Sequence, residues 1–110
     1  MNFTINGHVW TIVEMSAQEM QKTFVEYMGE PALYVFGLTK YPIQCIFINN
    51  ELVRDQKIRT LKHELTHCYI WETGLYNAPN YNDEMVCDIV ASSNEFINSV
   101  VYEYFKGNKT

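Results

Sequence analysis

The chain has few positively charged residues and no long apolar run, and each of these shortages excludes a class of protein. It contains 8 Lys and Arg against 13 Asp and Glu, and no run of basic residues stands out. Because binding to DNA or RNA phosphates needs a positively charged surface, we expect no nucleic-acid partner. No stretch reaches the ~20 apolar residues that cross a bilayer, so we expect no membrane span.

The chain also lacks the marks of a secreted protein. Its three cysteines, Cys45, Cys68 and Cys87, are an odd number, and residues 1–4 contain no basic segment that leads into an apolar run. Disulfide frameworks and signal peptides have the opposite features. We therefore expect a cytoplasmic protein with free thiols. Each cysteine is best explained as a small buried hydrophobe.

Repeats, low-complexity tracts and interior linkers are absent as well, which favours a single domain. The 110 residues suffice for one domain with a thin core, and the hydrophobic fraction of 47% supports a folded core. A bound metal ion would stabilise so small a domain. We expect the domain to cover residues 1–106 and residues 107–110 to form a frayed tail.

The first half of the chain predicts a β-hairpin, a helix and two strands. Asn6 and Gly7 lie between two runs of apolar and β-branched residues, which is a turn signal for a hairpin. Ser16 and Glu19 have the spacing of a capping box, which indicates the start of a helix. The apolar pattern gives the expected ranges as residues 3–13, 17–28, 32–39 and 43–48.

The second half predicts two helices and so completes an α+β fold. Apolar residues recur at helical spacing over residues 55–73, and Gly74 provides a stop signal. A second helix with a broad apolar face ends near Phe105, with Asn80 or Asn82 as its N-cap. We expect a small, mostly antiparallel sheet that packs on these two helices.

The sequence His63-Glu64-Leu65-Thr66-His67 is the motif that carries chemistry. Residues four apart on a helix share one face, so His63 and His67 can reach one metal ion. Neutral imidazole nitrogen is a preferred zinc ligand, and zinc lowers the pKa of a bound water to about 7. Glu64 would take the proton from that water and deliver it to the leaving amine. The motif therefore predicts a catalytic Zn²⁺ site with Glu64 as general base.

A catalytic zinc ion usually has three protein ligands, so the motif needs a partner outside it. Glu84 and Asp88 lie four residues apart on the next predicted helix and share a face. We assign Glu84 as the third ligand, and Asp88 as the acceptor of a hydrogen bond from the outer N–H of His63 or His67. The two acids could exchange these roles. Acidic residues in the first turn of a helix are also favoured simply by the helix dipole.

Several neighbouring residues have weaker claims to a role in this site. Tyr76 or Tyr81, in the loop before the last helix, could donate a hydrogen bond to the oxyanion of the substrate, and we assign this role to Tyr81. His8 and Cys87 are conceivable further ligands, but His8 is better explained as a surface residue. The strand at residues 43–48 either belongs to the core or, as an edge strand, pairs with an extended peptide.

Residues 61–67, together with residues 37–39 and the strand at residues 46–48, resemble the ImmA/IrrE-type zinc metallo-endopeptidases. The similarity is strongest to the short versions from phages and mobile elements of Gram-positive bacteria. Residues 84–88 also resemble the downstream glutamate segment of gluzincins. The resemblance covers roughly residues 34–97, and only the motif within residues 61–67 is highly specific.

The resemblance implies a zincin-like fold with a small sheet, an active-site helix and a glutamate ligand on the following helix. It also implies intracellular proteolysis, often of a transcriptional repressor. Transferred by position, the zinc ligands are His63, His67 and Glu84, and the base is Glu64. The expected substrate is a cytosolic protein, such as a repressor or another regulatory protein of a phage or mobile element.

Two other functions compete with peptide-bond hydrolysis. In one, the zinc ion only stabilises the fold of a non-catalytic protein-binding module. In the other, the chain is a fragment similar to the SprT-type proteases that act at DNA, which the acidic charge balance argues against. Glu64 favours the enzyme, because a structural zinc site needs no carboxylate beside its first histidine.

Overall fold

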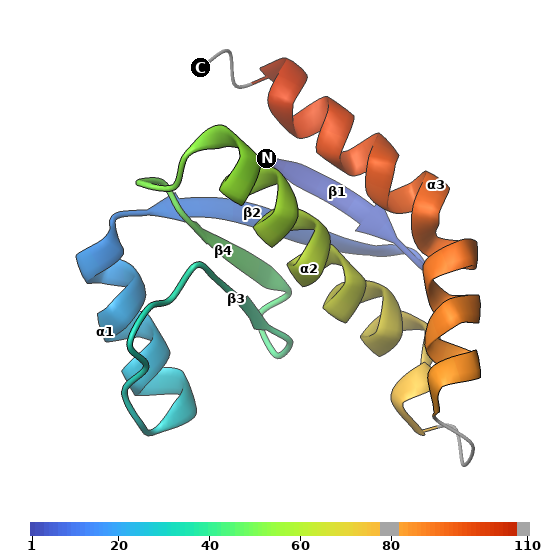
Figure 1. Cartoon of the computed structure of the whole chain (residues 1–110), viewed down its shortest axis with the longest axis horizontal. Coiled ribbons are helices and arrows are strands. Elements are labelled where there is room, and N and C mark those ends of the chain that lie inside the picture. Colours follow the sequence, from blue (N-terminus) through green and yellow to red (C-terminus); the bar gives the residue numbers. More distant parts are fainter. Residues whose placement is uncertain (78–81, 108–110) are drawn as a thin grey trace.

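The strands and helices of the chain form one α+β domain (Figure 1). The computed structural model describes residues 1–77 and 82–107, and of residues 83, 84, 87, 88 and 107 it describes only the backbone. Within this part of the chain, the elements are β1 (Asn2–Ile5), β2 (His8–Met15), α1 (Ala17–Met28), β3 (Gly37–Lys40), β4 (Cys45–Asn49), α2 (Arg54–Thr73), the 3₁₀ helix η1 (Leu75–Asn77) and α3 (Asp83–Gly107).

The strands form one mixed sheet in the order β1-β2-β4-β3. β1 and β2 pair antiparallel as the predicted hairpin, β3 and β4 also pair antiparallel, and β2 and β4 pair parallel. The expectation of a mostly antiparallel sheet is therefore correct for the two outer pairs and wrong for the central pair. Parallel strands need a crossover of a dozen or more residues, and here α1 and β3 lie within that crossover.

The edge strand next to β4 is β3. The hypothesis that residues 43–48 form an edge strand is wrong, because β4 lies between β2 and β3 and is paired on both sides. The strand predicted at residues 32–39 begins only at Gly37. Just before it, the Asn49 N–H donates to the Phe36 carbonyl at 2.9 Å, and the side-chain amide of Asn49 donates to the Val35 carbonyl at 3.2 Å.

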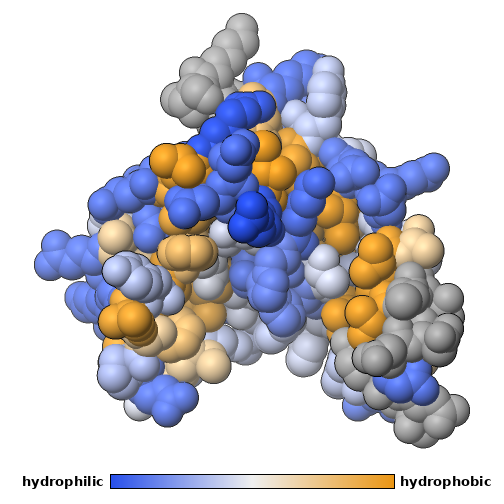
Figure 2. All heavy atoms as spheres, viewed as in Figure 1, coloured by the Kyte–Doolittle hydropathy of each residue, from blue (hydrophilic) through white to orange (hydrophobic). Residues whose placement is uncertain are grey.

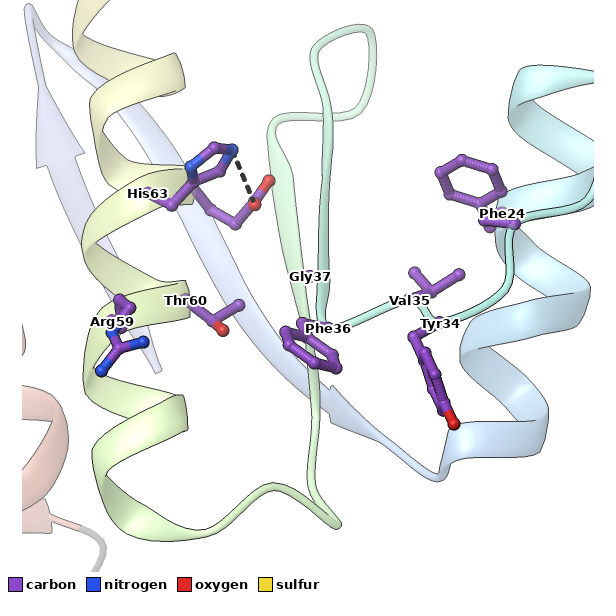
Figure 3. A pocket seen from close by; sticks show the side chains of 10 residues that line it. Phe24, Tyr34, Val35, Phe36, Gly37, Arg59, Thr60 and His63 are labelled. Carbon is purple, nitrogen blue, oxygen red and sulfur yellow. Dashed lines mark ion pairs between the residues drawn. The ribbon is translucent and has the colours of Figure 1, made fainter.

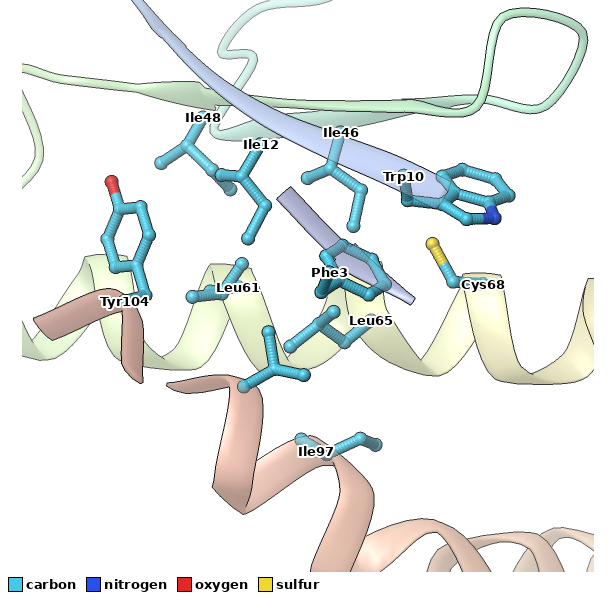
Figure 4. Packing of buried hydrophobic residues seen from close by; sticks show 11 residues of the cluster. Phe3, Trp10, Ile12, Ile46, Ile48, Leu61, Leu65, Cys68, Ile97 and Tyr104 are labelled. Carbon is cyan, nitrogen blue, oxygen red and sulfur yellow. The ribbon is translucent and has the colours of Figure 1, made fainter. Parts of the chain in front are cut away.

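Each face of the sheet is covered by helices (Figure 1). On one face, Met20 of α1 is buried with Leu38 and Phe47 of the strands. On the other face, α2 and α3 enclose a larger core with the alternate residues of the same strands. Figure 4 shows this larger core, whose members include Trp10, Ile12, Ile46, Leu61, Leu65 and Cys68.

The cysteines that the structure describes behave as core residues. Cys68 is completely buried, as predicted, and burial raises the pKa of its thiol. Burial also raises the pKa of the half-buried Cys45 thiol. Both thiols are therefore neutral and unreactive near pH 7. The side chain of Cys87 lies outside the described residues.

The first two long helices agree to within one residue with the ranges that the sequence predicts. α1 covers the predicted range, because Ser16 Oγ accepts the Glu19 N–H at 3.2 Å and the Glu19 carboxylate accepts the Ser16 N–H at 3.2 Å. α2 begins at Arg54, one residue earlier than expected. It ends before Gly74, whose φ of 71° is the left-handed conformation of a helix C-cap.

The third helix is longer than predicted. Asn82 is its N-cap, because its Oδ1 accepts the Met85 N–H at 3.1 Å. The helix continues past the expected end at Phe105 to Gly107, so the tail predicted at residues 107–110 does not include residue 107. Residues 108–110 lie outside the described part. In that part, no helix is long and apolar enough to cross a bilayer.

The last turn of α2 is tied to the N-terminal hairpin through Glu72. Its carboxylate accepts the Trp10 Nε1–H at 2.8 Å and lies 2.8 Å from His8 Nδ1, and its backbone carbonyl accepts the Asn6 side-chain amide at 3.0 Å. His8 has a side chain that is 54% exposed, which agrees with its prediction as a surface residue. These bonds fix where the end of α2 lies on the sheet.

Candidate metal centre

Two imidazoles meet on the solvent side of α2. The Nε2 atoms of His63 and His67 lie 3.1 Å apart, and the two rings are inclined at 78°. A tetrahedral zinc ion with two bonds to imidazole nitrogen holds those atoms ~3.3 Å apart, as follows from Zn–N distances of about 2.0–2.1 Å. The observed spacing fits the chelation of one zinc ion, which is what the motif predicts.

The surroundings of His67 keep its imidazole neutral. Burial lowers the pKa of His67, the nearby Glu64 carboxylate raises it, and the His63 imidazole lowers it further. A metal ligand must be the neutral form of histidine, because the lone pair of a protonated ring nitrogen is already used. The balance of these effects therefore favours the protonation state that binds a metal.

The Glu64 side chain is buried between α2 and β3. It is only 6% exposed, its Oε1 accepts the Thr39 hydroxyl at 2.8 Å, and its Oε2 lies 3.9 Å from His63 Nε2. A buried carboxylate is costly unless it is hydrogen-bonded, and Thr39 provides that bond. The sequence alone did not indicate Thr39, because the contact depends on how β3 is placed against α2.

Gly37 allows β3 to approach α2 this closely. A Cβ atom at position 37 would lie 2.7 Å from Thr60 Cγ2 and 3.0 Å from Glu64 Cγ. The first distance is shorter than van der Waals contact, so any larger residue would push the strand away from the helix. Glycine at this position is therefore a condition for the contact between Thr39 and Glu64.

A cleft of about 390 Å³ opens beside Glu64 and His63. Figure 3 shows Thr60 and His63 of α2 on one side of the cleft, Phe24 of α1 on the opposite side, and Phe36 between them. On the surface, Figure 2 shows hydrophilic side chains over the middle of this face and apolar side chains to either side of them. The cleft has the size and the mixed lining of a small-ligand or side-chain pocket.

An aromatic stack lies at the C-terminal end of α2, one turn beyond the site. Trp71 lies one turn after His67, and its ring stacks on Tyr41 at 4.5 Å and on Tyr76 at 5.2 Å between ring centroids. Tyr76, which was one of two candidates for binding an oxyanion, has a packing role in this stack.

The remaining predicted site residues lie outside what the structure describes. Tyr81 is not among the described residues, and of Glu84 and Asp88 only the backbone is described, in the first two turns of α3. The Tyr69 hydroxyl lies 3.0 Å from Ser92 Oγ, one turn after Asp88, and so links α2 to this part of α3. Among the described side chains, no group of three or more His, Cys, Asp or Glu could hold a metal ion.

Comparison of the chain with protein-family models, curated proteins and solved structures found no match. The resemblance to metallo-endopeptidases therefore stays a prediction from the motif. What the structure adds is the geometry of two histidines, a buried glutamate and an adjacent cleft.

Gly37→Ala should destabilise the protein by about 1–3 kcal/mol, because the new methyl group must displace Thr60 or Glu64. Urea unfolding followed by circular dichroism measures this loss. The matched variant is Thr60→Ser, which removes the methyl group that the new Cβ would meet. The double variant should recover part of the lost stability. If the two substitutions prove strictly additive, the close approach of β3 and α2 is not present.

Thr39→Val should cost about 1–3 kcal/mol of unfolding free energy, because the buried Glu64 carboxylate loses its hydroxyl donor while the shape is kept. Thr39→Ser retains the hydroxyl and should cost clearly less. The same urea titration compares the two variants. Equal losses for Val and Ser would mean that packing, and not the hydrogen bond, determines the contribution of position 39.

Proposed function

We propose that the protein is a zinc-dependent metallopeptidase that hydrolyses a peptide bond in another protein. The observation that carries the proposal is the buried Glu64 carboxylate, held by Thr39 and lying 3.9 Å from His63 Nε2 at the edge of a cleft. A buried acid beside paired metal-binding side chains in a cleft is typical of a catalytic base.

The burial of Glu64 argues against the non-catalytic binding module. A zinc ion that only stabilises the fold would need His63, His67 and further ligands, but no carboxylate at position 64. Burying an acid costs free energy, so a purely structural site would be more stable with an apolar residue there. In peptide hydrolysis the carboxylate has a function, because the reaction needs a proton acceptor close to the metal-binding atoms.

In the proposed mechanism, a zinc ion held by His63 and His67 would supply a Lewis acid that acidifies water and polarises the substrate carbonyl. Glu64 accepts the proton of the attacking water and delivers it to the nitrogen of the leaving amine. The hydrogen bond from the Thr39 hydroxyl to Oε1 holds the Glu64 carboxylate in place for this proton transfer. From the sequence, we assign Glu84 as the third ligand. We assign Asp88 as the acceptor of a hydrogen bond from the outer imidazole N–H of His63 or His67.

An extended peptide has a place to bind along β3. Among the described residues this strand pairs only with β4, so its other side offers backbone groups for pairing next to Glu64. Pairing of a peptide with such an edge would lay a scissile bond along α2, with one side chain in the cleft. The sequence assigns the oxyanion donor to Tyr81, and the family resemblance suggests a repressor or another regulatory protein as substrate.

Protein purified without chelator should contain about one zinc ion per chain, and elemental analysis measures it. His63→Ala and His67→Ala should lose the metal, whereas His8→Ala should keep it, because His8 bonds to Glu72 instead. Glu84→Ala should weaken zinc binding more than Asp88→Ala, because a lost ligand costs more than a lost hydrogen bond to a ligand. Wild-type protein that stays free of metal after zinc is added back would contradict the proposal.

Glu64→Gln should keep the fold and the zinc content but lower the rate of cleavage by at least about 100-fold, because glutamine cannot accept the proton. Mass spectrometry of a peptide library and of intact bacterial lysate, before and after incubation, detects the new chain ends. Lys62→Gln, an exposed change on the same helix, should cleave like the wild type. Unchanged cleavage by the Gln variant would exclude Glu64 as the base.

A further inference from the structure

We propose that Arg59 makes the cleft select a large apolar substrate residue that has an acidic neighbour, an inference that rests on the proposed function. The cleft beside Glu64 is lined by Phe24, Val35 and Phe36, which suit an apolar side chain. Arg59 lines the same cleft from α2, one turn before His63. The site thus combines an apolar pocket with one cation at its border.

The volume and the apolar border of the cleft determine which substrate side chain binds best. Its volume of about 390 Å³ is open to solvent past Tyr34, which is 76% exposed, and Phe36, which is 44% exposed. These two rings lie 6.4 Å apart and form an apolar border next to the edge of β3. A phenylalanine or leucine side chain would bury more of this apolar surface than a small residue would.

The positive charge near the pocket is concentrated on α2. Four of the eight Lys and Arg residues of the chain lie within its first nine positions, at Arg54, Lys57, Arg59 and Lys62. Lys57 pairs with Glu14 at 3.0 Å, and Arg54 lies over the Phe105 ring at 4.6 Å. Within the described residues, Arg59 takes part in no ion pair.

The charges that face Arg59 leave room for a carboxylate from the substrate. Asp55 lies one turn before it on α2, but no pair of charged atoms from these two residues lies within 4.0 Å. Glu64, which lies further along α2, already accepts the Thr39 hydroxyl. A guanidinium binds a carboxylate with two parallel hydrogen bonds, so an acidic residue next to the apolar one is the natural occupant.

Arg59 and His63 are four residues apart, so they share one side of α2. A peptide whose apolar residue fills the pocket would place its adjacent residues along this side of the helix. An acidic neighbour would then lie near Arg59, and the scissile bond near His63 and Glu64. Arg59 would act on the choice of substrate and not on the bond-breaking step.

The test measures peptide binding by NMR to the full-length Glu64→Gln protein as purified, so that no peptide is consumed. The probes are pentapeptides blocked at both ends, with a central Phe flanked on both sides by Asp, by Asn or by Lys. A fourth probe has Ala between two Asp residues. The backbone amides of Gly37 and Thr60 report on occupation of the cleft.

The Asp-flanked Phe peptide should bind about two- to fivefold more tightly than the Asn-flanked one, which is the range for an exposed ion pair, and the Lys-flanked one should bind most weakly. The Ala peptide should bind more weakly than its Phe counterpart. Arg59→Gln should abolish the preference for Asp, Arg59→Lys should keep part of it, and the matched control Lys62→Gln should leave it intact.

Equal binding of the Asp and Asn peptides, no response at Gly37, or a preference that survives in Arg59→Gln would overturn the proposal. A preference lost equally in Lys62→Gln would also overturn it, because the selection would then come from the charge of α2 as a whole. The NMR experiment measures peptide binding and does not depend on cleavage. Selective binding by a protein that holds no zinc and cuts nothing would therefore retain the role of Arg59 while excluding the peptidase.

Discussion

The contact between β3 and α2 controls the geometry of the whole candidate site. At Gly37 the strand lies so near the helix that a Cβ atom would be 2.7 Å from Thr60 Cγ2, and two residues later Thr39 bonds to Glu64. Alternate residues of a strand face the same side, so both contacts use the side of β3 that lies on the helix. The same strand thus sets the spacing between sheet and helix and the direction of the carboxylate.

Each residue of α2 is rotated by about 100° from the residue before it, so successive residues of the motif point in different directions. Leu65 points into the core beneath the sheet, Glu64 points to β3, and His63 is mostly exposed on the solvent side. One helix turn later, His67 returns to the side of His63. Three successive residues are therefore placed for core packing, for the proposed proton transfer and for the proposed metal binding, and the apolar core holds the helix at the angle that keeps these directions separate.

Features set by local chemistry could be predicted from the sequence, and features set by distant pairing could not. The capping box at Ser16 and the shared helix side of His63 and His67 depend only on residues within a turn of each other. The late start of β3, its edge position and the bond from Thr39 depend on the register between strands and helix. The predicted role of Glu84 depends likewise on how α3 lies against α2, which spacing within one helix does not determine.

The parallel pairing of β2 with β4 has a consequence for the order in which the chain folds. Thr11 must find Cys45 across α1 and β3 before the centre of the sheet exists, and such distant contacts form late. β3 can dock on α2 only once β4 is in place, since β4 is its sole strand partner in the described part of the chain. A nascent or partly unfolded chain would therefore lack an ordered Glu64. Under the proposed function, the candidate site would be assembled only when folding is complete, which would protect the cell during synthesis.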